Sequence, residues 1–223
     1  MKKWIFLFLL ILTACSPHSE SKNNEMQPEN TFMYQKYDIP LNDKLFLGNP
    51  EAEHTIFLAF DYACPWCKKW MLEVLPQLKE TLIQDGTAKY IAQPVTLLNK
   101  YSLIMAEADY VIEKNIPEHY YNLQLVLAKF LNEDKHSNLG KEEQHIQSEL
   151  EGLGYNFSEL SKITKIPDYL EITRQFTKKF NVQYVPTVYV DGIKISDSFN
   201  IEEIKGIINK TIQEGEIISI PKR

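Results

Sequence analysis

The stretch "DYACPWCKKW", residues 61–70, contains two cysteines, Cys64 and Cys67, separated by one proline and one tryptophan. The only other cysteine in the 223 residues is Cys15, far upstream. Three kinds of site use so close a pair: half of a metal site, a small structural disulfide, or a redox centre. The rest of the chain distinguishes between them.

Neither a metal nor a structural disulfide fits the chain well. A zinc site needs about four ligands, whereas this pair supplies two and the five histidines show no HxxxH spacing. We therefore expect no metal and no cofactor. A chain of 223 residues buries a sizeable core without a cross-link, and closing so short a loop removes little entropy from the unfolded chain. The pair is best interpreted as a redox centre.

Composition indicates a soluble globular domain. Hydrophobic residues make up 44% and charged residues 24% of the chain, which are ordinary values. The formal net charge is -6, and the sequence contains no basic stripe. We therefore expect no nucleic-acid partner.

The chain opens with "MKKWIFLFLLILTAC", in which two lysines precede an apolar run over residues 4–12. The run is too short to span a bilayer and has the layout of a secretory signal peptide. Its end, "LTAC", resembles the lipobox of bacterial lipoproteins. We expect residues 1–14 to be a lipoprotein signal peptide and Cys15 to carry the lipid. The alternative is an ordinary signal peptide followed by an incidental cysteine.

Residues 15–31 are expected to form a flexible tether, because almost no side chain in them can be buried. A linker of about 15 residues reaches roughly 20 Å. The protein would then be extracytoplasmic, held by a lipid on Cys15 at the outer face of a bacterial cytoplasmic membrane. Disulfides form and persist in that environment.

The folded part begins with a strand-helix-strand pattern. Residues 54–60, "HTIFLAF", predict a buried strand just before the cysteine pair. Helical spacing of apolar residues follows to Gly86, with an expected kink at Pro76. Residues 88–98 predict a second strand. This order is a βαβ unit.

A helical block and a final hairpin follow. The predicted helices and short turn of the block span residues 101–114, 118–132, 144–153, 158–164 and 167–180, with Pro167 in the first turn of the last helix. Two strands then flank Asp191-Gly192, a dipeptide typical of tight hairpin turns. Residues 201–213 predict a last helix, with Asn200 and Glu203 forming a capping box. This layout is that of an α/β thioredoxin fold with a helical insertion.

The chain resembles DsbA-type thiol-disulfide oxidoreductases of the thioredoxin superfamily, in lipoprotein form. The residues that carry the resemblance are "FDY" at 60–62, "CPWC" at 64–67 and "VPT" at 185–187, and it covers about residues 40–215. It implies three parts of the fold: residues 32–99 with the CPWC motif, a helical insertion at 100–166, and residues 167–223 with a cis-proline loop.

Position along the helix predicts different roles for the two cysteines. Cys64 lies where the strand ends and the helix begins, so unpaired backbone N–H groups and the helix dipole favour its thiolate. The thiolate is the reactive form. Cys67 lies almost one turn inside the helix. We expect Cys64 to be exposed and to attack, and the more buried Cys67 to resolve the mixed disulfide. A stabilised thiolate makes the disulfide oxidising.

The neighbours of the cysteines have less specific interpretations. Pro65 suits the first helical turn, because it has no N–H. Trp66 offers either an apolar surface for an unfolded client or simple packing. Lys68 and Lys69 either add positive charge near the sulfur or belong to a solvated helix face.

Asp61 has two interpretations. Its carboxylate could shuttle the proton of Cys67, and its charge would then also raise the pKa of Cys64. Alternatively, it caps the helix, which is the interpretation we favour. The buried acid that this family often carries six residues before its first cysteine is replaced here by Leu58.

The resemblance also assigns a role to Val185, Pro186 and Thr187. It implies a cis peptide bond before Pro186 and a loop packed against Cys64. Backbone groups of Val185 would pair with an extended client chain by strand addition.

These observations predict a membrane-tethered, monomeric oxidase that passes the Cys64–Cys67 disulfide to exported, cysteine-containing proteins. A membrane partner or a small molecule would reoxidise it. The alternatives are a tethered reductase or isomerase, or a binding module with an inert disulfide. An inert disulfide would have a reduction potential below about -300 mV.

Overall fold

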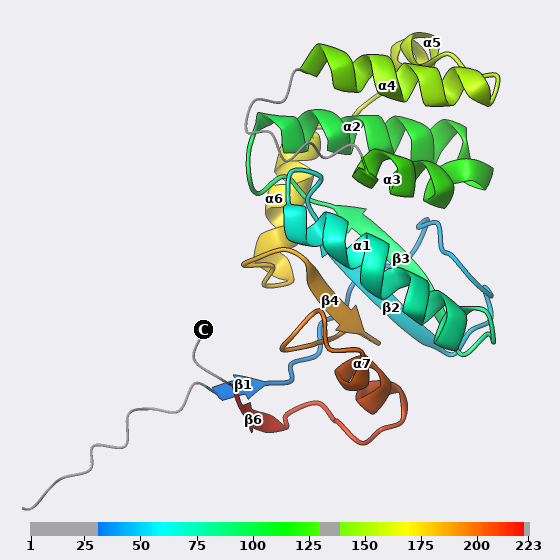
Figure 1. Cartoon of the computed structure of the whole chain (residues 1–223). Coiled ribbons are helices and arrows are strands. Elements are labelled where there is room, and N and C mark those ends of the chain that lie inside the picture. The colour runs from blue at the N-terminus through cyan, green and yellow to red at the C-terminus, as the bar shows by residue number, and fades with distance from the viewer. Residues whose placement is uncertain (1–30, 130–138, 221–223) are drawn as a thin grey trace, which may run out of the picture.

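The computed structural model describes residues 31–129 and 139–220. The predicted signal peptide and the lipidation site Cys15 lie outside these residues. The predicted tether also lies outside them, except for its last residue, Thr31. The described chain forms a central sheet covered by helices on both faces, with further helices stacked at one end of the sheet (Figure 1).

The sheet contains four strands in the order β3-β2-β4-β5. β2 runs parallel to β3 and antiparallel to β4. Helix α1 connects β2 to β3 and completes the predicted βαβ unit. This architecture confirms the predicted α/β thioredoxin fold. The bounds are β2 His54–Phe60, α1 Pro65–Leu78, β3 Ala88–Pro94, β4 Thr187–Val190 and β5 Ile193–Lys194.

The side chains of β2 point alternately to the two faces of the sheet and so contribute to two separate layers of the hydrophobic core. Ile56, Leu58 and Phe60 pack with buried residues of α1 and α7 (Ile201–Ile208). Phe57 and Ala59 join a second cluster, which includes Phe176 of α6 (Tyr169–Lys179) and two residues just after that helix, Phe180 and Val182. Successive side chains of a strand point to opposite faces, so a strand covered on both faces is apolar throughout. The continuous apolar run of β2 therefore reflects its central position.

The helical block between β3 and α6 contains α2 (Lys100–Asn115), α3 (Tyr120–Lys129), α4 (Leu139–Gly152) and α5 (Phe157–Ile163). Figure 1 shows α4 and α5 at the greatest distance from the sheet, with α2 and α3 between them and the sheet. The chain then returns along α6.

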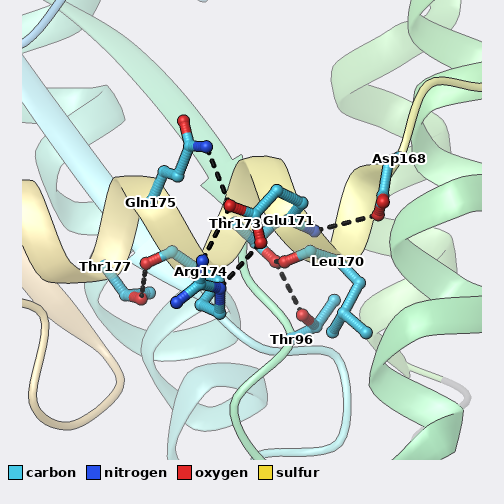
Figure 2. A network of polar contacts seen from close by, with 8 residues as sticks. All are labelled: Thr96, Asp168, Leu170, Glu171, Thr173, Arg174, Gln175 and Thr177. Carbon is cyan, nitrogen blue, oxygen red and sulfur yellow. Dashed lines mark hydrogen bonds and ion pairs between the residues drawn. The ribbon is translucent and has the colours of Figure 1, made fainter.

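α6 is tied to the segment that follows β3. The Thr173 and Thr96 hydroxyls lie 2.7 Å apart, and Figure 2 shows this bond beside the exposed ion pair of Glu171 with Arg174. The helix begins later than predicted. Pro167 precedes it, and Asp168 is the N-cap, accepting a hydrogen bond from the Glu171 N–H at 3.0 Å.

Two other predicted helices differ in detail. α1 continues through Pro76 to Leu78, and a π-helical turn follows at Lys79–Ile83. α7 ends at Ile208 rather than at residue 213.

The predicted capping box of α7 is wrong in one half. Asn200 caps the helix as expected, accepting from the Glu202 and Glu203 N–H groups. The Glu203 carboxylate instead accepts from the Ser196 and Asp197 N–H groups. It is therefore held by the segment before the helix and not by the N-cap.

The hairpin turn follows the predicted chemistry. Asp191 and Gly192 have φ of 51° and 82°, as a two-residue turn between twisted strands requires. A Cβ on Gly192 would lie 2.3 Å from the carbonyl oxygen of Tyr37. Glycine is therefore required here by close approach as well as by conformation.

One pair of strands was not predicted. β1 (Thr31–Met33) pairs antiparallel with β6 (Ile217–Ser219), near the two ends of the described chain. Thr31, assigned to the tether from sequence, is thus the first residue of β1. Three-residue strands are too short to show a period-two pattern. Among residues 31–129 and 139–220, the structure contains no helix long and apolar enough to cross a membrane.

Candidate active site at the start of helix α1

Cys64 is the N-cap residue of α1, with extended backbone angles of φ -95° and ψ 114°. Its carbonyl accepts hydrogen bonds from the N–H groups of Cys67 at 3.0 Å and Lys68 at 3.2 Å. Pro65 is in the first turn of the helix, where a missing N–H costs nothing. The sulfur of Cys64 is therefore at the positive end of the helix, as the sequence predicts.

Both cysteines of the motif are free thiols; Cys67 is buried as expected, whereas Cys64 is more buried than expected. The exposed fraction is 5% for Cys64 and 0% for Cys67. The prediction that Cys64 is exposed is wrong, because the loop at Val185 packs against the Cys64 side chain. The Cys64 thiol donates to the Val185 carbonyl oxygen at 3.4 Å. Cys64 remains the more accessible of the two.

The loop before β4 is fixed from several sides. The Val185–Pro186 peptide bond is cis. The Pro186 carbonyl accepts from the Ser198 hydroxyl at 2.7 Å, and the Thr187 hydroxyl donates to the Tyr184 carbonyl at 2.5 Å. Pairing of β4 with β2 therefore brings residues 185–187, remote in sequence, to the cysteine pair.

The surroundings of Cys64 lower the pKa of its thiol to about 7. The largest cause is a hydrogen bond from the Cys67 thiol; burial opposes it, and the backbone N–H groups of Cys67 and Trp66 add to it. The helix terminus thus contributes as predicted, but the neighbouring thiol contributes more. The Cys64 thiol therefore ionises more readily than an ordinary cysteine.

Burial raises the pKa of the Cys67 thiol far above its ordinary value, and its hydrogen bond to Cys64 raises it further. The N–H of Asp61 faces its sulfur at 3.5 Å. Cys67 therefore stays protonated when Cys64 ionises. The environment separates the two thiols chemically, with Cys64 as the nucleophile.

Asp61 does not cap α1, so the favoured interpretation of this residue is wrong. Its Oδ1 accepts from the Ala63 N–H at 2.8 Å, and its Oδ2 accepts from the Leu97 and Leu98 N–H groups at 2.8 and 3.1 Å. All three donors lie outside the helix, and the residue is completely buried. Leu58, at the position of the family's acid, is buried in β2.

Trp66 lies on the surface beside the pair, with an exposed fraction of 59%. Its ring packs edge-on against Phe199, with centroids 6.0 Å apart, and Lys69 Nζ lies 5.4 Å from its centroid. Trp66 borders a hollow of about 310 Å³ next to the cis-proline loop, whose other lining residues are Tyr184, Val185, Pro186, Asp197, Ser198 and Phe199.

A buried polar cluster behind the site was not predicted. Asp109 of α2 accepts from the Tyr62 hydroxyl at 2.5 Å and from the Tyr120 hydroxyl at 2.9 Å, and Gln124 donates to it at 3.3 Å. Burial raises the pKa of Asp109 to about 6, although these three hydrogen bonds lower it. The cluster joins the helical block to Tyr62, two residues before Cys64.

No metal site accompanies the pair in the part of the chain that the structure describes, since no group of three or more His, Cys, Asp and Glu side chains is placed to hold an ion.

Comparison with known proteins agrees with this geometry. A family model described as thioredoxin matches residues 41–210. The chain belongs to this thioredoxin family. The family match includes both cysteines and the loop at 185–187.

Other relatives match most of the chain. This thioredoxin-family protein is 25% identical over 181 residues to disulfide bond formation protein D of Bacillus subtilis, covering 75% of this chain and 76% of the relative. It is similar in fold to the crystal structure of oxidised BdbD from Bacillus subtilis, with a TM-score of 0.71, 21% identity and coverage of 80% and 98%. DsbA of Chlamydia trachomatis is similar, with a TM-score of 0.65, 18% identity and coverage of 78% and 93%.

The causes of the Cys64 pKa predict a graded response to substitution at Cys67. In the reduced protein, thiolate absorbance at 240 nm should titrate with a midpoint near pH 7. Cys67→Ala removes the hydrogen-bond donor and should raise the midpoint, whereas Cys67→Ser retains a donor and should raise it less. Equal midpoints in the wild type and Cys67→Ala would show that the thiol contact does not stabilise the thiolate.

The buried Asp109 carboxyl predicts a stability that depends on pH. Its pKa is raised from 3.8 to about 6 in the folded chain, so the folded state binds more protons between these values. The free energy of unfolding should therefore fall as pH rises from about 4 to 6, by about 3 kcal/mol from this group. Asp109→Asn should lose that part of the slope in urea denaturation, and the exposed-site control Asp85→Asn should keep it. If the free energy of unfolding depended on pH in the same way in the wild type and in Asp109→Asn, the raised pKa would not belong to Asp109.

Proposed function

We propose that the protein is an extracytoplasmic thiol-disulfide oxidoreductase of the DsbA type, which donates a Cys64–Cys67 disulfide to exported proteins. One observation carries the proposal: the pKa of Cys64 is lowered while that of Cys67 is strongly raised. Stabilising one thiolate stabilises the reduced form and makes the disulfide a ready donor. The relative named disulfide bond formation protein D supports the same reaction.

The reaction proceeds by two exchanges. A client thiolate attacks Cys64 Sγ of the disulfide, the Cys64–Cys67 bond breaks, and Cys67 leaves and takes up a proton. A second client thiolate then attacks the client sulfur of the mixed disulfide, and Cys64 leaves as a stabilised thiolate. The client loses two electrons and gains a disulfide, and the protein becomes the dithiol. The low pKa of Cys64 makes it a good leaving group.

The Val185 carbonyl suggests how the site alternates between its two forms. It accepts from the Cys64 thiol at 3.4 Å in the dithiol form. A disulfide or a thiolate at Cys64 has no proton to donate, so the carbonyl becomes available to a client N–H. An extended client segment can then pair with the loop by strand addition, with its cysteine next to Cys64.

An apolar surface for such a client lies beside the loop. The hollow bordered by Trp66 and Phe199 adjoins Val185 and Pro186. Unfolded chains expose apolar side chains that folded proteins bury. The location of the hollow beside the reactive sulfur favours unfolded, exported, cysteine-containing proteins as clients.

The anchor, the reoxidant and the assembly state complete the proposal. The lipobox-like "LTAC" supports lipidation of Cys15, which would hold a monomer at the outer face of a bacterial cytoplasmic membrane. A lipid and a tether of about 15 residues with a reach of roughly 20 Å keep the site near the membrane. Reoxidation requires an electron acceptor, either a membrane partner or a small-molecule oxidant.

Replacing the resolving cysteine should trap clients. Cys67→Ser, expressed in the host, should accumulate mixed disulfides, which form when the Cys64 thiolate attacks a client disulfide and displaces one client thiolate. They persist because the protein has no Cys67 thiol to attack the mixed disulfide and release the client. Non-reducing electrophoresis and mass spectrometry would identify them. The Cys64→Ser/Cys67→Ser double variant is the matched control. Absence of trapped species in the single variant would argue for an inert pair.

Lipidation makes a separate prediction about location. Cys15→Ser should abolish the lipid and release the protein from the membrane fraction, with no change in its ability to oxidise a reduced, unfolded protein in solution. Fractionation of cells and intact-protein mass spectrometry measure both properties. Unchanged membrane association of Cys15→Ser would rule out the lipid as the anchor.

A further inference from the structure

Asp61 is a buried carboxylate with an unusual set of partners. It follows directly after β2 and has an exposed fraction of 0%. Three backbone N–H groups donate to its oxygens: Ala63 at 2.8 Å, Leu97 at 2.8 Å and Leu98 at 3.1 Å. In each contact the oxygen is the acceptor, as in an ionised carboxylate. These contacts offset the cost of removing the charge from water.

The segment that holds the carboxylate is itself fixed on both sides. Thr96 pairs with Thr173 of α6 at 2.7 Å. Asn99 and Ser102 form a capping box at the start of α2. Leu97 and Leu98 lie between these anchors. The carboxylate of Asp61 therefore has little freedom to move when the charge of the dithiol changes.

The backbone of Asp61 contacts both halves of the dithiol. Its N–H faces Cys67 Sγ at 3.5 Å, and its carbonyl accepts from the Cys64 N–H at 3.0 Å. The side chain is thus a buried negative charge on the residue whose backbone contacts both cysteines. The hydrogen bond from Cys67 is the largest effect on the pKa of Cys64 and lowers it, and the charge of Asp61 opposes that lowering. Burial is the largest effect on the pKa of Cys67 and raises it, and the charge of Asp61 adds to it. Such repulsion is only weakly screened in a buried site.

We propose that Asp61 is a positioning residue whose fixed charge limits the oxidising power of the Cys64–Cys67 disulfide. The hydrogen bond from Cys67 and the N–H groups at the tip of α1 favour the reduced, ionised form of the pair. Asp61 opposes them, because a second negative charge next to it is unfavourable. The balance between these hydrogen bonds and the charge of Asp61 sets the reduction potential of the disulfide. That potential is lower than the value that the helix terminus alone would give. The inference rests on the proposed exchange chemistry.

The other charged groups near the pair are in different environments. On α1, Lys69 is exposed and contacts Glu73 at 3.8 Å, and Lys68 is half-buried. Asp197, in the segment before α7, is exposed. Asp109 is buried on the side of α2 and binds Tyr62. Water screens the charges of the exposed groups. We therefore expect Asp61 to be the carboxylate that repels the Cys64 thiolate most strongly.

Neutralising Asp61 should make the disulfide more oxidising. In Asp61→Asn, the pKa of Cys64, followed at 240 nm, should fall below its wild-type value near 7. The equilibrium constant with glutathione should shift about tenfold toward the reduced protein, which corresponds to about 30 mV. Asp61→Glu keeps the negative charge, so its equilibrium constant with glutathione should remain within about twofold of the wild-type value. Asp85→Asn, an exposed carboxylate that accepts from the Thr87 N–H, is the matched control and should not shift.

The outcomes separate tuning from a purely structural role. A folded Asp61→Asn protein with an unchanged Cys64 pKa and glutathione equilibrium would overturn the proposal. Asp61→Ser provides a second neutral variant, whose hydroxyl can still accept from the Ala63 N–H. Loss of the fold in both neutral variants would also overturn it, in favour of a structural clamp. Neither measurement uses a client, so failure of the client-trapping experiment would be a distinct result.

Discussion

The chemistry of this protein depends on the difference in ionisation between two neighbouring thiols. Cys64 lies at the end of α1, where the Cys67 thiol and backbone N–H groups face its sulfur and lower its pKa. Cys67, one turn further, is fully buried, and its pKa is raised. A disulfide between groups so differently placed has one good leaving group and one poor one. Attack falls on Cys64 because Cys67 is fully buried, and release of the client is favoured because Cys64 leaves as the stabilised thiolate.

The surrounding fold maintains this arrangement from three directions. β2 ends just before the motif, and β4 brings the cis-proline loop against Cys64. The segment after β3 donates N–H groups to Asp61. The helical block contributes Asp109, which binds Tyr62. Each contact joins the motif to a different part of the chain, so the helical block is part of the framework that supports the site.

Much of this could be predicted from local sequence. The apolar run of β2, the helical spacing after the cysteines and the Asp191-Gly192 turn each reflect short-range preferences, and the structure agrees with all three. Local signals were less informative where two interpretations fit the same residue. Asp61 just before a helix has the pattern of a cap, yet two of its three hydrogen-bond donors are the N–H groups of Leu97 and Leu98. The carboxylate of Glu203 likewise does not bind the N-cap residue but accepts from the N–H groups of Ser196 and Asp197, in the segment before α7.

The order of predicted strands and helices, with the resemblance carried by residues 60–62, 64–67 and 185–187, was sufficient to predict the thioredoxin fold. The start of the helix at the cysteine pair predicted which cysteine is the nucleophile, because helix polarity and thiol spacing are properties of contiguous residues. The pairing of β1 with β6, the burial of Cys64 under Val185, the environment of Asp61 and the Asp109 cluster all depended on tertiary structure. Each of these joins segments distant in sequence, and their burial and charge environment exist only once the chain has folded.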